Sequence, residues 1–300
     1  MAPALLVDTY SLFFRAHHAL PPMNTASGRP TSALYGFCTA LLKELRERRP
    51  SALAFAVDAP VRTFRHEAYA GYKAQRERAP DPLRQQFGPL RELLATFSVP
   101  MFEVPGYEAD DVLATLASEL RAASLSAIVL SGDRDLLQLA HGSVQVLFLG
   151  ARGQPGRVYD EAAVLERFAV PPRQLPSWAA LVGDTSDNLP GTPGVGARTA
   201  AKWVQQYGSI PSLLDQLAQL EPARLRPVIE AHAEQLLQNE RLATLRIDVP
   251  LGAPPHVGPL RPAAIENLRL LFRELEFKSL EARLDSLAEA LPPSSLTPDP

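Results

Sequence analysis

Short apolar runs, broken by a polar residue only at Gln145, recur along the first half of the chain and predict buried strands. They cover residues 4–7, 52–57, 127–130 and 144–149. Runs that are apolar at every position are typical of parallel strands buried on both faces of a sheet. Amphipathic helical patterns lie between the runs, at 31–48, 83–97, 108–121 and, more briefly, 135–140. Strands that alternate with helices predict an α/β fold with a mostly parallel central sheet flanked by helices.

The pattern changes at about residue 175, where helical stretches and tight turns replace the strands. We expect helices near 211–220, 223–239 and 262–289. The chain is therefore predicted to contain an α/β domain at 1–174 and an all-α subdomain at 175–290. Residues 291–300 are rich in proline and serine and are expected to form a disordered tail or the start of a linker.

Acidic residues follow the first three apolar runs. Asp8 follows the first run and Asp58 the second, and the third leads to Asp133 and Asp135. One aspartate at a strand end is common as a turn or cap residue. The carboxyl ends of parallel strands line the ligand crevice of an open α/β sheet, so several acids in this position indicate a common site.

A further acidic cluster opens the helical pattern at 108–121. Glu108 and Asp111 share a helix face, and Asp110 lies about 100° away around the axis. Taken alone, the cluster is explained equally well by its interaction with the helix dipole, which contributes about 0.3–1 kcal/mol per acid. Close carboxylates also repel, by about 4 kcal/mol per pair at 4 Å and a dielectric constant near 20. A divalent cation relieves that repulsion.

The stretch 183–203 combines acids, glycines and cations. Asp184 and Asp187 are one helical turn apart, and Gly194-Val195-Gly196 follows between two helical stretches. Such a turn is the signature of a helix-hairpin-helix, whose backbone N–H groups can face a phosphate. Arg198 and Lys202 add positive charge behind it. The alternative is an ordinary glycine-rich connection between helices.

The segment 61–80 mixes cations with aromatic residues. Its members are Arg62, Phe64, Arg65, Tyr69, Tyr72, Lys73, Arg76 and Arg78. Charges that meet phosphates and rings that stack on bases suit a single-stranded nucleic acid. A solvated helix whose aromatic residues face the core explains the same pattern equally well.

Bulk composition excludes several classes of protein. The chain has 300 residues, no apolar run long enough to span a bilayer, and an N-terminus without a basic region, which we interpret as a strand and not a signal peptide. Cys38 is the only cysteine, which suits a reducing cytoplasm. The net charge of −3 does not exclude a nucleic-acid partner. If nine acids share one site, 24 acids remain against 30 lysines and arginines.

Assembled in order, these motifs resemble the 5′-nuclease (flap endonuclease) superfamily. The resemblance is greatest to the N-terminal 5′→3′ exonuclease domain of bacterial DNA polymerase I, and it spans residues 4–285. The matching motifs are Asp8 after the first strand, 64–76 (FRHEAYAGYKAQR), 104–111 (VPGYEADD), 132–135 (GDRD) and 183–191 (GDTSDNLPG) followed by 194–196 (GVG). The resemblance implies a PIN-like nuclease fold with a C-terminal helix-hairpin-helix subdomain and a basic arch at about 61–82.

The resemblance also implies a metal site with nine acidic ligands. The family's carboxylates match Asp8, Asp58, Glu108, Asp110, Asp111, Asp133, Asp135, Asp184 and Asp187. They are expected to hold two, or at most three, Mg²⁺ or Mn²⁺ ions for in-line hydrolysis of a phosphodiester. The six histidines show no zinc spacing.

Further residues receive roles from the same resemblance. Lys73 and Arg76, with Asp110 and Asp111, are the expected catalytic residues. The expected DNA contacts are Arg15, Arg62, Arg65, Tyr72, Lys73, Arg76, Gly194, Val195, Gly196, Arg198 and Lys202. A K⁺ ion is expected at the backbone carbonyls of Leu181, Val182, Pro190 and Thr192.

We therefore expect a metal-dependent, structure-specific 5′-nuclease that acts in DNA replication and repair. Its expected substrates are 5′ flaps, nicks and frayed 5′ ends of DNA, RNA primers among them. We expect a cytoplasmic, nucleoid-associated monomer with a DNA polymerase as a candidate partner and no membrane. The chief alternative is a catalytically silent module that binds DNA junctions. A single-strand ribonuclease of a related fold and an aspartate-based phosphatase fit less well. Two departures from the family pattern are Arg134, where lysine is common, and residues 77–82 of the arch.

Overall fold

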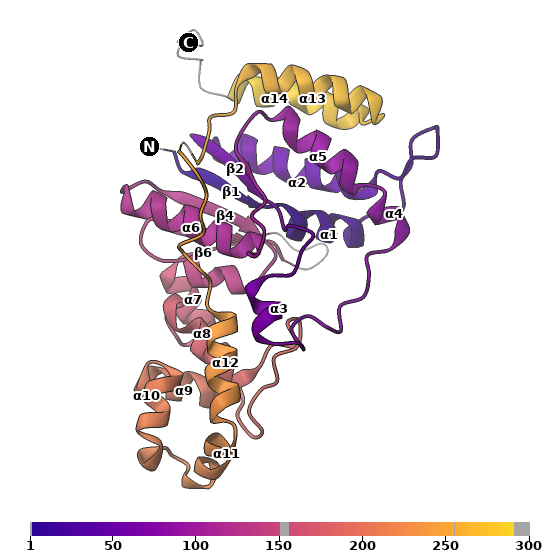
Figure 1. The fold of residues 1–300 in the computed structure, drawn as a ribbon. Helices are drawn as coiled ribbons and strands as arrows, with labels where there is room; N and C mark the ends of the chain where they lie inside the picture. Colours follow the sequence, from indigo (N-terminus) through magenta and orange to yellow (C-terminus); the bar gives the residue numbers. More distant parts are fainter. Residues whose placement is uncertain (1, 151–155, 255, 291–300) are drawn as a thin grey trace.

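A six-stranded sheet forms the centre of the protein in this computed structural model, which describes residues 2–150, 156–254 and 256–290 (Figure 1). The strand order is β3-β2-β1-β4-β5-β6. The strands are β1 (Ala4–Asp8), β2 (Ala52–Ala56), β3 (Met101–Phe102), β4 (Ala127–Ser131), β5 (Val144–Phe148) and β6 (Arg157–Tyr159). Only the β5–β6 pairing in this sheet is antiparallel. The predicted α/β fold with a mostly parallel sheet is confirmed.

Successive side chains of the inner strands enter two separate cores. In β1, Leu5 and Val7 face one core and Ala4 and Leu6 face the other. The first core is covered by α1 (Thr9–Ala19), α2 (Ser32–Arg48) and α5 (Phe87–Thr96). The second is covered by α6 (Ala109–Ala122). The inner strands are apolar at almost every position because both faces of the sheet are buried, and the exceptions are Gln145 and the strand-end residues Asp8 and Ser131.

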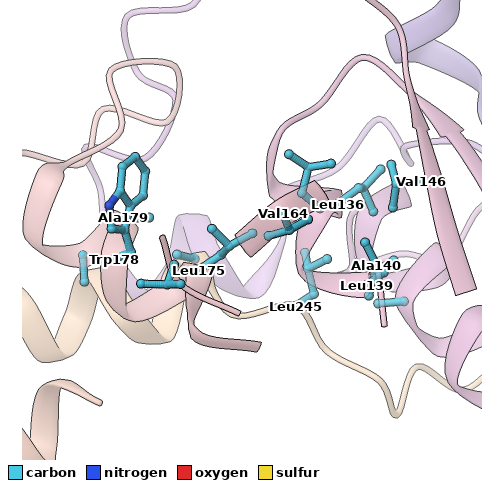
Figure 2. Close-up of a cluster of buried hydrophobic side chains, with 14 of the residues drawn as sticks. Leu136, Leu139, Ala140, Val146, Val164, Leu175, Trp178, Ala179 and Leu245 are labelled. Atoms are coloured by element: carbon cyan, nitrogen blue, oxygen red, sulfur yellow. The ribbon is translucent and has the colours of Figure 1, made fainter. Parts of the chain in front are cut away.

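The second core continues into a helical part of the molecule. Its helices are α7 (Glu161–Phe168), α8 (Leu175–Val182), α9 (Ala197–Tyr207), α10 (Ile210–Asp215), α11 (Arg226–Ala231) and α12 (Ala233–Ala243). Figure 2 shows Val146 of β5 near Leu136, with Val164 of α7 beyond and Leu175 and Trp178 of α8 farther on. The sheet and the helical part therefore share one continuous apolar core.

The last two helices return to the sheet, which revises the predicted 175–290 subdomain. The helices α13 (Pro262–Glu274) and α14 (Lys278–Ala290) pack beside α5 and α2 and contribute to the first core (Figure 1). The single helix predicted at 262–289 is interrupted at Glu276, whose φ of 61° ends α13. The predicted tail at 291–300 lies outside the described residues. No helix in the described part of the chain has the length and apolar character needed to cross a bilayer.

The segment predicted as a basic arch contains little helix. Two short helices, α3 (Phe64–Ala68) and α4 (Asp81–Arg84), flank turns and extended chain. The chain crosses from the sheet toward the helical part at α3 and then returns (Figure 1). This path brings residues of α3 against the start of α6.

One buried ion pair fixes that crossing. Nη1 and Nη2 of Arg65 lie 2.6 and 2.8 Å from the two carboxylate oxygens of Asp111, and both residues are almost wholly buried, with 1% and 0% of their surfaces exposed. Arg65 also donates to the carbonyls of Leu242 and Thr244, and the backbone N–H of Arg246 donates to Asp111. Three segments that are distant in sequence are thereby joined through two charged side chains.

We predict that Asp111→Asn lowers the free energy of unfolding by about 3–5 kcal/mol, because it removes the bidentate counter-charge of the buried Arg65 guanidinium and leaves Glu108, at 3.5 Å, as the remaining acid beside it. Urea unfolding measures the change. A matched control is Glu166→Gln, which breaks an exposed pair with Arg157 and is expected to lose at most about 1 kcal/mol. Equal unfolding midpoints for wild type and Asp111→Asn would contradict the structural role of the pair.

Candidate active site

The acids that end the strands meet in one cleft beside the start of α6. The cleft has a volume of about 280 Å³. Its lining residues are Asp8, Tyr10, Ser11, Phe14, Asp58, Lys73, Arg76, Glu108, Asp110, Gly132 and Asp133. Five of the nine predicted metal ligands are therefore brought together at the carboxyl ends of β1, β2 and β4.

Asp8 is held by serines from two elements. Its carboxylate caps α1 by accepting the backbone N–H of Ser11 at 3.1 Å, and it accepts the hydroxyl of Ser131 at 2.5 Å. Burial, with the nearby charges of Asp58 and Asp133, raises the Asp8 pKa to about 7. The carboxylate is oriented by hydrogen bonds but lacks a nearby positive charge sufficient to balance its own.

The neighbouring carboxylates are in similar surroundings. Asp58 accepts the backbone N–H of Ala109 at 2.8 Å, and burial raises its pKa despite this bond. The pKa of Asp110 is raised well above its usual value by burial and then by Asp133 and Asp8. These acids destabilise one another when all are ionised, so the cleft favours a bound cation.

Three of the other four predicted ligands form a second group beyond Asp133: Asp135, Asp184 and Asp187. Burial and then the charges of Asp133, Asp187 and Asp184 raise the pKa of Asp135 well above its usual value. Burial also raises the pKa of Asp187. Asp184 differs, because the Ser186 hydroxyl and Arg134 outweigh burial and lower its pKa. A cavity of about 590 Å³ adjoins this group and is lined in part by Arg134, Asp184 and Thr185.

The two groups of acids suit divalent ions that keep part of their water shell better than an ion surrounded only by protein ligands. In the described residues, no three His, Cys, Asp or Glu side chains converge closely enough to surround a single ion directly. Oxygen-only ligands with room between them suit Mg²⁺ and Mn²⁺, which keep part of their water shell in proteins.

Two cations at the rim of the cleft are paired with its acids. The Lys73 ammonium lies 3.0 Å from both carboxylate oxygens of Glu108 and 3.8 Å from Asp187. Burial alone would lower the Lys73 pKa, but Glu108 and Asp187 raise it above its usual value. The side chain therefore carries a positive charge. Arg76 is half-exposed and bonds Asp187 at 3.0 Å. Lys73 and Arg76 thus occupy the position from which a phosphate beside the acids could be contacted.

Three predicted site residues have other surroundings than expected. The Asp111 carboxylate points away from the cleft to Arg65, and both of its oxygens are engaged, so it is corrected from metal ligand and catalytic residue to structural residue. Arg65 is buried in the same pair and cannot contact DNA directly. Tyr72 is 2% exposed, and its hydroxyl donates to Glu108 and Asp187, so it is not free to stack on a base. Of the two explanations left open for 61–80, an inward-facing aromatic residue is correct for Tyr72.

The sequence analysis missed the aromatic wall of the cleft. Tyr10 and Phe14 project from α1 into the lining, and both rings pack against Phe87, with centroids 5.4 and 6.1 Å away. The signal was available, since an apolar-rich stretch, 9–19, follows an N-capping aspartate at residue 8. No helix was predicted there.

The predicted hairpin turn joins two packed helices. The turn lies between α8 and α9, and its Gly194 has a φ of 78°, a conformation that favours glycine. Gly196 caps α9 and is exposed like Gly194, while Val195 is buried. Arg198 and Lys202 are both exposed on α9, one turn apart.

The other predicted contacts are dispersed. Arg15 is half-buried on α1 next to the cleft residue Phe14, and burial lowers its pKa. Arg62 is exposed and donates to the carbonyl of His66. The four residues of the expected K⁺ site, Leu181, Val182, Pro190 and Thr192, are contiguous in space, since the N–H of Thr192 donates to Leu181 and Gly191 lies against Val182.

Two family models match the chain in consecutive segments. Residues 3–169 match the model described as 5′-3′ exonuclease, N-terminal resolvase-like domain. Residues 170–265 match the model described as 5′-3′ exonuclease, C-terminal SAM fold.

Curated relatives agree with these models. The 5′-3′ exonuclease of Aquifex aeolicus is 35% identical over 96% of this chain and 96% of its own. DNA polymerase I of Mycobacterium tuberculosis is 40% identical over 95% of this chain, and the thermostable DNA polymerase I of Thermus thermophilus is 40% identical over 92%. The chain spans about a third of the length of these polymerases, 32% in each case.

Solved structures share the fold at lower identity. A complex of the bacteriophage T5 flap endonuclease with DNA and metal ions is 21% identical, covers 96% of this chain and 99% of its own, and has a TM-score of 0.65. The catalytic core of Rad2 in complex with DNA substrate is 17% identical, covers 95% of this chain and 92% of its own, and has a TM-score of 0.63. Both matches extend from the sheet through the helical part. Together with the two family models, they confirm the resemblance noted in the sequence: the chain belongs to the 5′-3′ exonuclease family of nucleases.

Proposed function

We propose that the chain hydrolyses DNA phosphodiesters at 5′ flaps, nicks and frayed 5′ ends in a divalent-metal-dependent reaction. The observation that carries this proposal is the group of acids beside the carboxyl ends of β1, β2 and β4 and the start of α6, where burial and neighbouring acids raise the pKa values of Asp8 and Asp110 even though Lys73 pairs with Glu108. The relatives and the family models give the polarity of the reaction. The T5 and Rad2 structures are complexes with DNA, which supports the substrate class.

Eight carboxylates would hold the metal ions. The first group is Asp8, Asp58, Glu108, Asp110 and Asp133, and the second is Asp135, Asp184 and Asp187. Two divalent ions at these acids, Mg²⁺ or Mn²⁺, with a third as the upper limit, would lower the pKa of water at the site and stabilise negative charge on the attacking and leaving oxygens. The protein's contribution is to fix these acids through Ser11, Ser131 and the backbone N–H of Ala109.

Lys73 and Arg76 would exchange their acidic partners for the phosphate of the substrate. In this structure they neutralise Glu108 and Asp187. When cations compensate those acids instead, the ammonium and guanidinium are available to the scissile phosphate, where they orient it and stabilise negative charge that develops during hydrolysis. A role of this kind requires that both side chains are held at the rim, which the backbone of 71–76 does.

Recognition would depend on shape and on the phosphate backbone. The exposed N–H groups at Gly194 and Gly196, with Arg198 and Lys202, suit one strand of a duplex at a distance from the cleft. We also propose that frayed RNA primers are accepted, that a DNA polymerase is a partner, and that the protein acts as a cytoplasmic, nucleoid-associated monomer.

A K⁺ ion at the hairpin is part of the same proposal. In the described residues the Thr192 hydroxyl is buried without a hydrogen-bond partner, which supports a ligand there. The carbonyl of Leu181 accepts one N–H, and that of Pro190 accepts two side-chain amides. The fit is therefore better for Leu181, Val182 and Thr192 than for Pro190.

We expect Asp133→Asn to reduce the rate of flap cleavage roughly 10²- to 10³-fold, because it removes an acid of the first group whose charge also acts on Asp135 of the second. The amide oxygen can still accept the N–H of Asp135, so folding should be retained. Cleavage is measured under single turnover, and flap affinity by fluorescence anisotropy with Ca²⁺. Asp285→Asn, an exposed change on α14, serves as the control. Cleavage at the wild-type rate by Asp133→Asn would refute the metal-site assignment.

The stability of the protein should respond to Mg²⁺ only where the acids are ionised. The pKa of Asp8 is raised on folding to about 7, so the folded protein retains a proton that the unfolded chain has lost, and metal-free stability decreases as pH rises toward 7. Mg²⁺ at about 100 times its Kd at pH 8 should raise the free energy of unfolding by about 2.7 kcal/mol near pH 8. The same Mg²⁺ concentration should raise it much less near pH 5.5, where Asp8 is protonated. Thermal unfolding with and without Mg²⁺ tests this expectation. Equal stabilisation at both pH values would contradict it.

A further inference from the structure

The base of the arch is attached to a loop of the helical part. Residues 71–76 lie against 184–188, and the backbone N–H of Lys73 donates to the carbonyl of Asp187 at 3.1 Å. Gln75 and Arg76 donate side-chain N–H groups to the carbonyls of Thr185 and Ser186, at 2.6 and 3.3 Å. The position of Lys73 is thus set from the helical part as well as from the sheet.

Asn188 contributes the one side-chain hydrogen bond that the loop gives to the arch backbone. Its Nδ2 donates to the carbonyl of Gly71 at 2.7 Å. The same carbonyl accepts the backbone N–H of Ala74 at 3.1 Å, which closes the turn that contains Lys73. Asn188 is half-buried, and among the described residues its side chain forms no hydrogen bond or ion pair with an acid of either group.

The turn that Asn188 supports is conformationally unusual. Lys73 has a φ of 53°, in the left-handed region that residues with a Cβ rarely adopt, so its surroundings must maintain that conformation. Room is restricted on the other side of the turn, because a Cβ on Gly71 would lie 2.5 Å from the Tyr69 ring. Relaxation of the turn would rotate the Lys73 side chain away from Glu108.

The loop itself is a firm support. Asp184 and Leu189 exchange backbone hydrogen bonds at 2.8 Å, and the buried Leu189 packs against Tyr72 and Leu242. Gly183 and Gly191 approach so closely that a Cβ on Gly191 would lie 2.1 Å from the carbonyl oxygen of Val182. A donor fixed on this loop can therefore define the place of the arch.

We propose that Asn188 is a positioning residue for Lys73. Through the Gly71 carbonyl it holds the turn from which the ammonium reaches the scissile phosphate, so it affects the chemical step without touching the substrate. This inference rests on the proposed nuclease function and on the role of Lys73 in it.

Asn188→Gly tests the inference with little disturbance of the backbone. Asn188 has a φ of 58°, which glycine adopts freely, so the variant removes the donor alone. We expect the single-turnover rate of flap cleavage to fall about tenfold, the loss of one hydrogen bond, with flap affinity within about twofold of wild type. Ser124→Gly, at an exposed position with a φ of 57° at the end of α6, is the matched control and should cleave as wild type does. Asn188→Asp, which keeps the shape but not the donor, should lose rate as the glycine variant does.

A double-mutant cycle separates positioning from general destabilisation. If Asn188 acts through Lys73, then Asn188→Gly has no more than about a twofold effect in a Lys73→Ala background. The same tenfold loss in that background, or a wild-type rate for the single variant, would overturn the proposal.

Hydrogen exchange of the backbone amides provides a readout that does not depend on cleavage. Asn188→Gly should accelerate exchange at 72–76 and leave residues 197–207 of α9 unchanged. If the wild-type protein cuts no flap, the proposed function fails while this readout still decides whether Asn188 holds the arch. Unchanged exchange at 72–76 would overturn the positioning role.

Discussion

Repulsion among carboxylates in a half-buried cleft is the constraint around which this molecule is arranged. Burial and repulsion from neighbouring acids raise the pKa values of Asp8, Asp110 and Asp135. The ionised form of each acid is therefore destabilised unless a cation is bound nearby. The acids converge because parallel strands end at one edge of the sheet and α6 begins there. Two kinds of contact restrain them: hydrogen bonds from serine hydroxyls and backbone N–H groups, and the ammonium of Lys73 at the rim. A site of this kind suits nucleases that use divalent ions, because a bound cation relieves the repulsion among the acids.

The cleft is lined by residues of the α/β part, while the helical part supplies Asp184 and Asp187 of the second acidic group and supports the rim of the cleft. The sheet and α8 share one core, and the buried pair between Arg65 and Asp111 joins α3, α6 and the chain after α12. The loop at 184–188 supplies two acids and also supports the turn that carries Lys73. A duplex bound at the hairpin and a phosphate bound at the cleft would therefore be held by parts of one rigid framework. Shape selectivity for a junction follows from the fixed distance between them.

Much of this arrangement could be predicted, because the inner strands are almost entirely apolar and acids follow where the first three apolar runs end. Asp111 could not be placed correctly, since helical periodicity groups it with Glu108 but does not say which face is turned inward. Its partner, Arg65, lies 46 residues away in sequence. The return of α13 and α14 to the sheet was missed for a related reason: their apolar faces are evident, but a periodic pattern does not reveal which core they join. The wall formed by Tyr10 and Phe14 was missed because a strand-end aspartate was considered as a ligand and not also as a helix cap.

The most direct test of the account is the polarity and metal dependence of cleavage on matched flap substrates. The protein would be incubated with a 5′-labelled 5′-flap duplex, a 3′-flap duplex of the same sequence and the corresponding single strand. The account predicts cutting near the 5′ junction in Mg²⁺ or Mn²⁺, abolition of cutting by EDTA, and no cutting at the 3′ flap. Tight binding of the 5′ flap without cleavage in either metal would contradict the account and indicate a module that binds junctions without hydrolysing them.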